Sequence, residues 1–375
     1  MNLTVGLPRM HKEAGEKRDF LPSLVTFLDG LGAREIVVEE GYGSGMDVSL
    51  QEYLDASPKA RLGTYDECLA QDLVVMLRCP DDASLRKLRR GTILFSMLHY
   101  PTRPQRVALL RELGIHGISL DSLTDDIGRR LVENLHAVGW NGVQAAFREL
   151  ARTYRRFREP SRRSLRATIL GAGAVGGHAA RAASRYGDEK LRQSMLAAGV
   201  PGVEVTLLDY DLTGHENYML TRLESTDLLV DATCRPDSSR PVIPNDWVAA
   251  LPVHAVMLDL SVDPYDFTSD PPSLKGIEGI PEGNLDQYVF LPDDPVYERM
   301  DPRINTVHRR VALSCYSWPG VHPRACMEVY GQQLEPLLRV VFERPLEELD
   351  ERHGRYFERA VARAELTRWQ KSPTH

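Results

Sequence analysis

Residues 167–187 read ATILGAGAVGGHAARAASRYG, and this stretch decides the fold. An apolar run typical of a strand leads into a glycine-rich turn, and an alanine-rich helical segment follows. Gly171, Gly173 and Gly176 fit G-x-G-x-x-G, a pattern that supplies a tight turn, a close backbone approach to a pyrophosphate and close packing of helix on strand. The helix N-terminus, which includes Val175, favours an anion. The stretch therefore predicts a dinucleotide-binding unit.

Asp209 closes the apolar run VEVTLL, where a dinucleotide site needs a carboxylate for the ribose hydroxyls. It lies farther from the glycines than the usual separation of about 20 residues. Residues 187–202, GDEKLRQSMLAAGVPG, account for the excess as an extended or second helix and a turn. Because a carboxylate repels a 2′-phosphate, Asp209 predicts NAD over NADP, a preference that Arg222 or Arg235 would oppose. The alternative is an ordinary surface aspartate.

Composition bounds the class of protein. The chain has 375 residues, enough for two domains, and with 42% hydrophobic and 26% charged residues it is typical of a soluble globular protein. A net charge of −7 argues against a nucleic-acid partner, and we interpret the basic cluster at residues 152–166 as a solvated helix end rather than an anion site. No run approaches the ~20 apolar residues of a membrane span, and no signal-peptide core is present. We expect a cytoplasmic protein with no membrane partner, either a monomer or a homo-oligomer.

Five cysteines form no C-x-x-C pair and no Cys/His ligand spacing. An odd, unpatterned set predicts reduced thiols and no structural metal site.

Strand-like and helix-like runs alternate along the chain, which predicts an α/β fold with parallel sheets. The candidate strands before residue 136 are NLTVGL, REIVVEE, DLVVML, TILFSML and IHGISLD. A long helix is predicted across residues 129–157, and RATILG, VEVTLLD, DLLVDAT and AVMLDLS are the later strands. This order predicts an NAD-binding domain at residues 136–322, inserted into a substrate domain formed by residues 1–135 and 323–375. The site is expected in the cleft between the domains.

Several segments, in this order, resemble the superfamily of alanine dehydrogenase and the NAD-dependent, L-lysine-forming saccharopine dehydrogenase. They are VGLPRMHKEAGEKRDFLPSLVTFL, VVMLRCP, GTILFSMLHY, LDSLTDDIGRRL, VMLDLSVDP and SWPGVHPR. DDIGRR and LDLSVDP look closer to saccharopine dehydrogenase, whereas SWPGVHPR looks closer to alanine dehydrogenase. The resemblance implies two Rossmann-like domains, a nicotinamide dinucleotide cofactor and oxidation at a carbon that bears nitrogen.

The resemblance also implies a set of site residues. Lys17 and Arg18 match the cation that holds a substrate carboxylate, and His99 matches the catalytic histidine. Arg78 stands where the family has a catalytic lysine. Asp263 matches an aspartate near cofactor and substrate. Two further cations, Arg129 and Arg130, match a segment beside the substrate site of saccharopine dehydrogenases.

The residues support these assignments independently, each beside a structural alternative. His99 and Arg78 follow apolar runs, so both are expected at the carboxyl ends of strands, where open α/β sheets bind ligands. An imidazole can exchange a proton near neutral pH, whereas a guanidinium stays charged and can only orient or polarise. The alternatives are a structural His99, an Arg78 paired with nearby aspartates, solvated side chains in the Lys17 loop, and an Asx-turn at Asp263.

We therefore predict an NAD-dependent oxidoreductase acting on the CH–NH bond of an amino acid or an opine-like secondary amine, with His99 as proton carrier. The many cations favour a saccharopine-like substrate with more than one carboxylate. Alternatives are alanine dehydrogenase-type deamination, and a cofactor-binding protein that has lost catalysis because Arg78 replaces the lysine. A methyltransferase is disfavoured by the two-ended domain plan.

Overall fold

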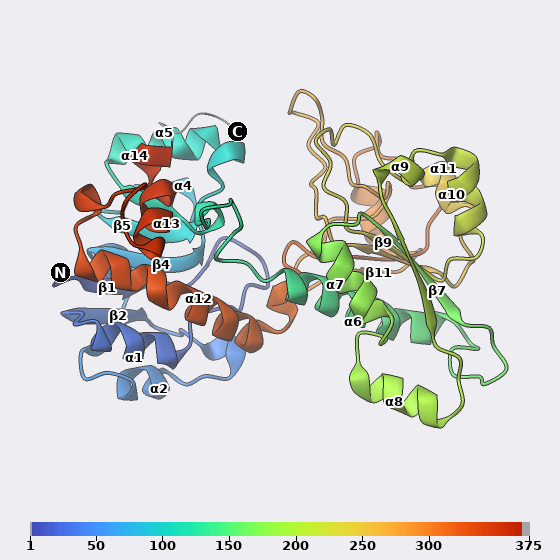
Figure 1. The fold of residues 1–375 in the computed structure, drawn as a ribbon, viewed down its shortest axis with the longest axis horizontal. Helices are drawn as coiled ribbons and strands as arrows, with labels where there is room; N and C mark the ends of the chain where they lie inside the picture. Colours follow the sequence, from blue (N-terminus) through green and yellow to red (C-terminus); the bar gives the residue numbers. More distant parts are fainter. Residues whose placement is uncertain (1, 370–375) are drawn as a thin grey trace. The chain divides into compact units, whose positions relative to one another are not determined.

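The computed structural model describes residues 2–369 and divides the chain into two compact units (Figure 1). Unit 1 combines the chain up to Asn134 with the chain from His322 onward, and unit 2 is Leu135–Val321. Each unit has one six-stranded sheet with helices on both faces. The predicted fold class, two Rossmann-like α/β domains with one inserted into the other, is confirmed.

The sheet of unit 1 is parallel throughout, with strand order β3-β2-β1-β4-β5-β6. Its strands are buried on both faces, which is why they read as continuous apolar runs rather than alternating ones. The sequence did not single out β3, a short strand that carries an arginine. The bounds are β1 (Thr4–Leu7), β2 (Glu35–Glu39), β3 (Ala60–Gly63), β4 (Leu73–Arg78), β5 (Ile93–Met97) and β6 (His116–Ser119).

Helices from both ends of the chain cover this sheet. On one face, side chains of β4 such as Val75 join a core with α1 (Pro22–Gly30), α12 (Pro323–Glu343) and α13 (Tyr356–Ala364). Val74 points to the opposite core, beneath the helices on the other face. These are α3 (Tyr65–Leu69), α4 (Asp82–Leu85), α5 (Pro104–Leu113) and α14 (Leu366–Trp369); α2 (Leu50–Asp55) lies near the β3 edge.

Unit 2 has strand order β11-β12-β10-β9-β7-β8, parallel except for β11. Its strands are β7 (Leu165–Leu170), β8 (Val203–Leu208), β9 (Leu228–Asp231), β10 (Val256–Asp259), β11 (Val289–Phe290) and β12 (Val311–Ser314). One face packs on α6 (Leu135–Thr153), α7 (Ala174–Ala183) and α8 (Glu189–Ala197). The other packs on α10 (Glu216–Leu223) and α11 (Asn245–Val248), and a single turn, α9 (Tyr210–Thr213), follows β8.

The helix predicted across residues 129–157 is shorter at both ends than expected. Residues before Leu135 stay extended because Leu131 donates its amide to Leu123 and Arg130 pairs with Thr124. α6 therefore starts only at Leu135. Neither α6, α12 nor any other helix in residues 2–369 combines the length and the apolar character that crossing a membrane requires.

Candidate functional site

The glycine turn of unit 2, residues 171–176, has the geometry that a dinucleotide requires. Gly171 has φ +97°, and a Cβ there would lie 2.5 Å from the carbonyl oxygen of Ala232. A Cβ on Gly176 would lie 1.9 Å from the carbonyl oxygen of Gly171, so only glycine lets α7 pack this closely on β7. A Cβ on Gly173 would meet nothing within 4 Å. The backbone at Gly173 is thus open to an approaching phosphate, and the turn fits a pyrophosphate.

Gly173 is also the N-cap of α7, a helix long enough for its first amides and its dipole to favour an anion. Val175 turns partly inward and packs against the core of unit 2. Gly173 and Val175, two of the predicted cofactor contacts, therefore both lie where β7 leads into α7.

Asp209 lies beside this turn. β7 and β8 pair along their whole length, and the amide of Gly171 donates to Leu208 at 2.7 Å. The Asp209 side chain is exposed and accepts one hydrogen bond, from the amide of Tyr210 at 2.8 Å. The structure therefore brings the predicted ribose carboxylate next to the predicted phosphate turn, with α8 accommodating the longer connection.

Asp263 belongs to the segment that follows β10. Its carboxylate accepts a hydrogen bond from the guanidinium of Arg235 at 2.6 Å, and its carbonyl accepts one from Lys275 at 3.1 Å. Arg235 is nearly buried and also donates to the carbonyls of Arg240 and Leu274. The recorded hydrogen bonds of Asp263 are therefore to side chains from other segments rather than to the backbone of an Asx-turn.

In unit 1, His99 follows β5 and has left-handed backbone torsions, with φ 52°. Its Nδ1 lies 3.4 Å from Oδ2 of Asp121, and its amide donates to Oδ1 at 3.2 Å. The Ser119 hydroxyl donates to the same oxygen at 2.7 Å. Burial raises the pKa of Asp121, but the hydrogen bonds and charge of His99 and the Ser119 hydroxyl outweigh it, leaving the pKa at about 2. An ionised carboxylate thus orients an imidazole that is 44% exposed.

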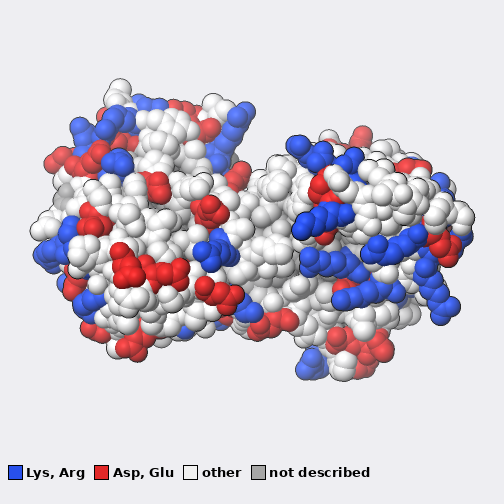
Figure 2. Space-filling view, turned by 90° about the horizontal axis from the view of Figure 1, so that it is seen from below, with Lys and Arg blue, Asp and Glu red and all other residues white. Residues whose placement is uncertain are grey.

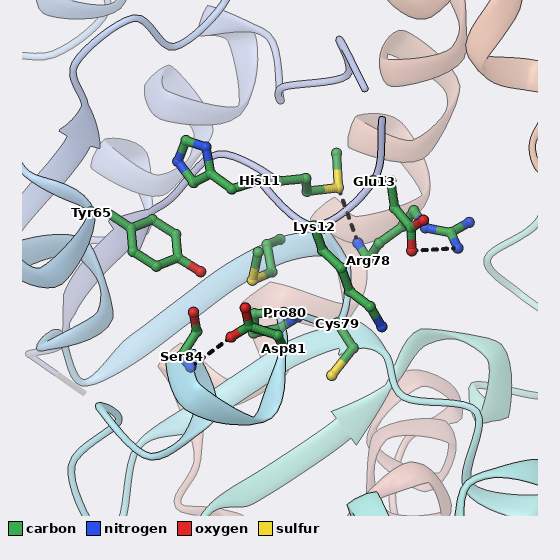
Figure 3. A pocket seen from close by; sticks show the side chains of 11 residues that line it. His11, Lys12, Glu13, Tyr65, Arg78, Cys79, Pro80, Asp81 and Ser84 are labelled. Atoms are coloured by element: carbon green, nitrogen blue, oxygen red, sulfur yellow. Dashed lines mark hydrogen bonds and ion pairs between the residues drawn. The ribbon is translucent and has the colours of Figure 1, made fainter. Parts of the chain in front are cut away.

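Arg78 ends β4, the neighbouring strand, and pairs in register with Met97, two residues before His99. Figure 3 shows its guanidinium beside Glu13, with NH2 3.2 Å from Oε1. A small cavity adjoins the pair; it leaves about 20 Å³ for the centre of a water-sized sphere, room for about one water. Its lining includes His11, Lys12, Tyr65, Cys79 and Ser84.

Arg18 is buried and holds Glu16, with Nε 2.8 Å from Oε1 and NH2 2.5 Å from Oε2. Burial raises the pKa of Glu16, but the hydrogen bonds and charge of Arg18 and then the charge of Arg78 lower it overall. The proposed solvated role is therefore wrong for Arg18. Lys17 is exposed, and its chain packs against Gly45. Arg18 and Arg78 are thus each paired with a glutamate of the same segment, Glu16 and Glu13 respectively.

Arg129 and Arg130 are exposed at the end of a tight turn in which Asp125 accepts the amides of Ile127 and Arg129. These hydrogen bonds hold the turn within unit 1.

Several site residues were missed at the level of sequence. Glu13 and Glu16 occupy the two arginines, so the cations that predicted a substrate with more than one carboxylate are balanced by carboxylates of the chain itself. Asp121 was also missed, although its position after the run IHGIS, a strand end next to that of His99, was an available signal. Asp231 carried the same signal, since it ends the predicted strand DLLVDAT, whereas Lys275 gave none.

The basic cluster at residues 152–166 is largely paired. Arg163 binds Asp227, and Arg162 is buried against the carbonyl of Phe157. Figure 2 shows Lys and Arg side chains gathered over one face of unit 2. Within residues 2–369 no three His, Cys, Asp or Glu side chains come together as a metal site would require, and the five cysteines are free thiols.

The chain is similar in sequence to one protein family and to several characterised proteins. The family described as alanine dehydrogenase/PNT, N-terminal domain, matches residues 6–135. The alanine dehydrogenase of Mycobacterium tuberculosis strain H37Rv is 26% identical over 281 residues, which cover 70% of this chain and 73% of that protein. The alanine dehydrogenase of Bacillus subtilis strain 168 is 22% identical over 346 residues, 86% of this chain and 81% of that one.

Two solved structures share the fold. An L-alanine dehydrogenase aligns with a TM-score of 0.71 and 19% identity, covering 96% of this chain and 94% of that one. A transhydrogenase from Sinorhizobium meliloti aligns with a TM-score of 0.63 and 18% identity, covering 91% and 94%. The fold is that of a two-domain Rossmann-like protein with an inserted domain. The N-terminal part of the chain thus resembles the alanine dehydrogenase/PNT family, and the whole chain is similar to alanine dehydrogenases in sequence and in fold.

Proposed function

We propose that this chain is an NAD-dependent dehydrogenase that oxidises the CH–NH2 group of a small amino acid to an imino acid, which water then hydrolyses to the keto acid and ammonium. The observation that carries the proposal is the His99–Asp121 pair at a strand end next to that of Arg78, in the domain that matches the family. The similarity of the chain to alanine dehydrogenases and the geometry of the glycine turn support NAD as the cofactor. Bound NAD accepts a hydride from the carbon that bears nitrogen.

His99 is the proposed proton carrier. Because Nδ1 faces the carboxylate of Asp121, this nitrogen carries hydrogen and Nε2 is left to take a proton from the substrate or from water. Arg78 cannot share this task, since a guanidinium does not deprotonate in proteins. We therefore assign the proton transfer to the imidazole of His99, which Asp121 orients.

Arg78 is the proposed carboxylate clamp. Its side chain is 27% exposed and its contact with Glu13 is 3.2 Å long, whereas Arg18 is almost fully buried and held at two atoms by Glu16. A substrate carboxylate would replace Glu13 on the guanidinium fork, a geometry that suits carboxylates. Arg18 and Glu16 would hold the neighbourhood of Arg78 in place.

A small substrate with one carboxylate is better supported than the saccharopine-like substrate that the sequence favoured. Arg18 is almost fully buried against Glu16, whereas the side chain of Arg78 is 27% exposed, so only Arg78 offers an accessible face. The curated relatives named above are alanine dehydrogenases. Asp263 is proposed to contribute near the cofactor, whereas Lys17, Arg129 and Arg130 remain predicted substrate contacts.

A coupled assay tests this proposal. Reduction of NAD is measured with alanine, other small amino acids and saccharopine, and oxidation of NADH with small keto acids plus ammonium. We expect turnover with a small amino acid and little with saccharopine. The reverse preference would overturn the proposed substrate class. Tight NAD binding without turnover on any of them would favour a cofactor-binding protein that has lost catalysis, a second candidate that rests on Arg78 in the lysine position.

A further inference from the structure

A buried cluster of charged and hydroxyl side chains lies at the carboxyl ends of three strands in unit 2. Asp231 ends β9, Asp259 ends β10 and Ser314 ends β12, and Ser261 and Lys275 complete the cluster. Asp231 is fully buried, and Asp259 and Lys275 are each 1% exposed. Buried ionised groups are rare without partners, so the hydrogen bonds of this cluster can be accounted for atom by atom.

Lys275 Nζ has three oxygen atoms within hydrogen-bond distance. This nitrogen lies 2.7 Å from Oδ2 of Asp259, 3.1 Å from the carbonyl oxygen of Asp263 and 3.3 Å from the hydroxyl of Ser314. An ammonium has three donors and no acceptor, and three acceptors are in place. Asp259 is the matching carboxylate, since burial raises its pKa but the charge and hydrogen bond of Lys275 lower it overall.

The two contacts of the Ser261 hydroxyl are the geometric argument for a proton on the second carboxyl, that of Asp231. The hydroxyl lies 2.8 Å from Oδ2 of Asp231 and 3.1 Å from Oδ1 of Asp259, but a hydroxyl donates only one hydrogen. If both carboxyls were ionised, one of these contacts would place two acceptors against each other in a buried site. A proton on Asp231 satisfies both contacts and makes the cluster neutral. Burial raises the pKa of Asp231, and the negative charge of Asp259 raises it further. Both effects favour the protonated carboxyl that the contacts of Ser261 indicate.

Asp231 adjoins the glycine turn. It pairs in register with Leu170, the residue before Gly171, and the next amide, that of Ala232, donates to Leu170 at 2.9 Å. The carbonyl of Ala232 is the group that excludes a side chain at Gly171. A charge on Asp231 would therefore lie directly beside the loop that is proposed to hold the pyrophosphate.

We propose that Asp231 is a positioning residue that carries a proton when the glycine turn binds the dinucleotide, so that no buried negative charge opposes the pyrophosphate. The proposal rests on the proposed cofactor. The charged groups that face Asp231 are Asp259 and Lys275, with the Arg235–Asp263 pair in the same segment. Where solvent pH is high enough to ionise Asp231, dinucleotide binding would take up one proton from solvent onto this carboxyl.

The protonation state is tested directly in the full-length protein by carboxyl carbon NMR of labelled aspartates across pH 6–9. Asp231→Asn identifies the resonance, and it preserves a neutral group that can donate to Ser261. Should that variant fail to fold, Thr233→Val identifies it instead, because Thr233 donates to Asp231 at 2.7 Å. We expect the Asp231 resonance of the wild type to be that of a neutral carboxyl at pH 7. The resonance of an ionised carboxylate at pH 7 would overturn the proposal.

Calorimetric titration with NAD tests the link to binding. At every pH where Asp231 is neutral, wild type and Asp231→Asn should bind NAD within about twofold of each other. Above the pH at which the resonance titrates, wild-type affinity should fall by roughly tenfold relative to the variant, the effect of two like charges about 10 Å apart at an effective dielectric constant of about 20. If the carboxyl titrates and the affinities stay equal, the proposal is wrong. Absence of NAD binding by both proteins would overturn the proposed function as well.

Discussion

The imidazole of His99 and the carboxylate of Asp121 face each other at the ends of two neighbouring strands, with Nδ1 3.4 Å from Oδ2 and the His99 amide 3.2 Å from Oδ1. One carboxylate thus holds both the backbone and the ring of His99. This arrangement fixes which ring nitrogen is free for proton transfer, and it accounts for a non-glycine residue in left-handed backbone torsions.

His99→Asn should keep NAD affinity while turnover falls by about 10²–10⁴, the range for loss of a general acid or base. Asp121→Asn should also lower turnover, because an amide can donate to Nδ1 and favour the wrong tautomer. Asp82→Asn, an exposed acid on α4, is the control and should leave kcat unchanged. The kcat of each variant is measured by steady-state kinetics across pH 5–9. Normal turnover of His99→Asn at all pH values would remove His99 from the mechanism.

The same pair should stabilise the fold in a pH-dependent way. A carboxyl whose pKa is lowered contributes stability that is fully present above its unfolded pKa near 4 and is lost as pH falls through about 2. The contribution is about 1–2 kcal/mol, reduced by the exposure of His99. Urea unfolding at pH 4 and pH 2 should show a smaller loss for Asp121→Asn than for wild type; equal losses would contradict the pairing.

Asp209→Ala should weaken NAD binding by one or two hydrogen bonds to a charged group, each about 1.5–3 kcal/mol, and narrow the preference over NADP. The cost to folding should be small, because the exposed carboxylate caps only a single turn, α9. Binding of both cofactors is measured by calorimetry beside Asp211→Ala. Unchanged affinities for Asp209→Ala, together with a loss for Asp211→Ala, would move the ribose contact to Asp211.

Three alanine substitutions separate packing from ligand contact in the glycine turn. Gly176→Ala should destabilise the protein and abolish NAD binding, since its Cβ would lie 1.9 Å from a carbonyl oxygen. Gly173→Ala should fold normally, because its Cβ meets no protein atom within 4 Å, yet bind NAD more weakly. Gly177→Ala is the matched control, equally open within α7, and should gain up to about 1 kcal/mol of stability. Thermal unfolding without NAD measures the change in stability of each variant, and the shift caused by NAD measures its change in binding. Unaltered NAD affinity in Gly173→Ala would argue against a pyrophosphate at Gly173.

The sequence predicted the features that depend on local pattern. The run before Gly171 and the other buried strands were predicted from their continuous apolar runs, and the fold class follows from their order. The strands β3 and β12 were missed; β3, at the edge of its sheet, has an arginine and a glycine among its four residues, so it does not read as an apolar run. Partners distant in sequence were not predictable either. Glu13 reaches Arg78 from another segment, and Lys275 lies in a stretch rich in Pro, Asp and Ser that is typical of an exposed loop. Tertiary packing alone buries that lysine.

Arg78→Lys tests the position at which the chain departs from the alanine dehydrogenase and saccharopine dehydrogenase pattern that it resembles. If Arg78 clamps a carboxylate, lysine should mainly raise the Michaelis constant of the amino acid, because a point charge replaces two parallel donors. If the position has lost a catalytic lysine, the substitution should raise kcat. The pH profile adds a second readout, since a lysine could introduce a further ionisation beside that of His99.

Glu13→Gln is the matched variant, because Glu13 occupies the guanidinium in the structure, with NH2 3.2 Å from Oε1. Removing that charge should take away one competitor for the guanidinium of Arg78 and lower the Michaelis constant of the amino acid. The cost to folding should be small, because both side chains are about a quarter exposed and such pairs contribute about 0–1 kcal/mol. In the double variant the benefit of Glu13→Gln should shrink, since its effect passes through the guanidinium. A higher kcat with an unchanged Michaelis constant in Arg78→Lys, and no effect of Glu13→Gln, would reject the clamp and favour the view that Arg78 marks a lost catalytic lysine.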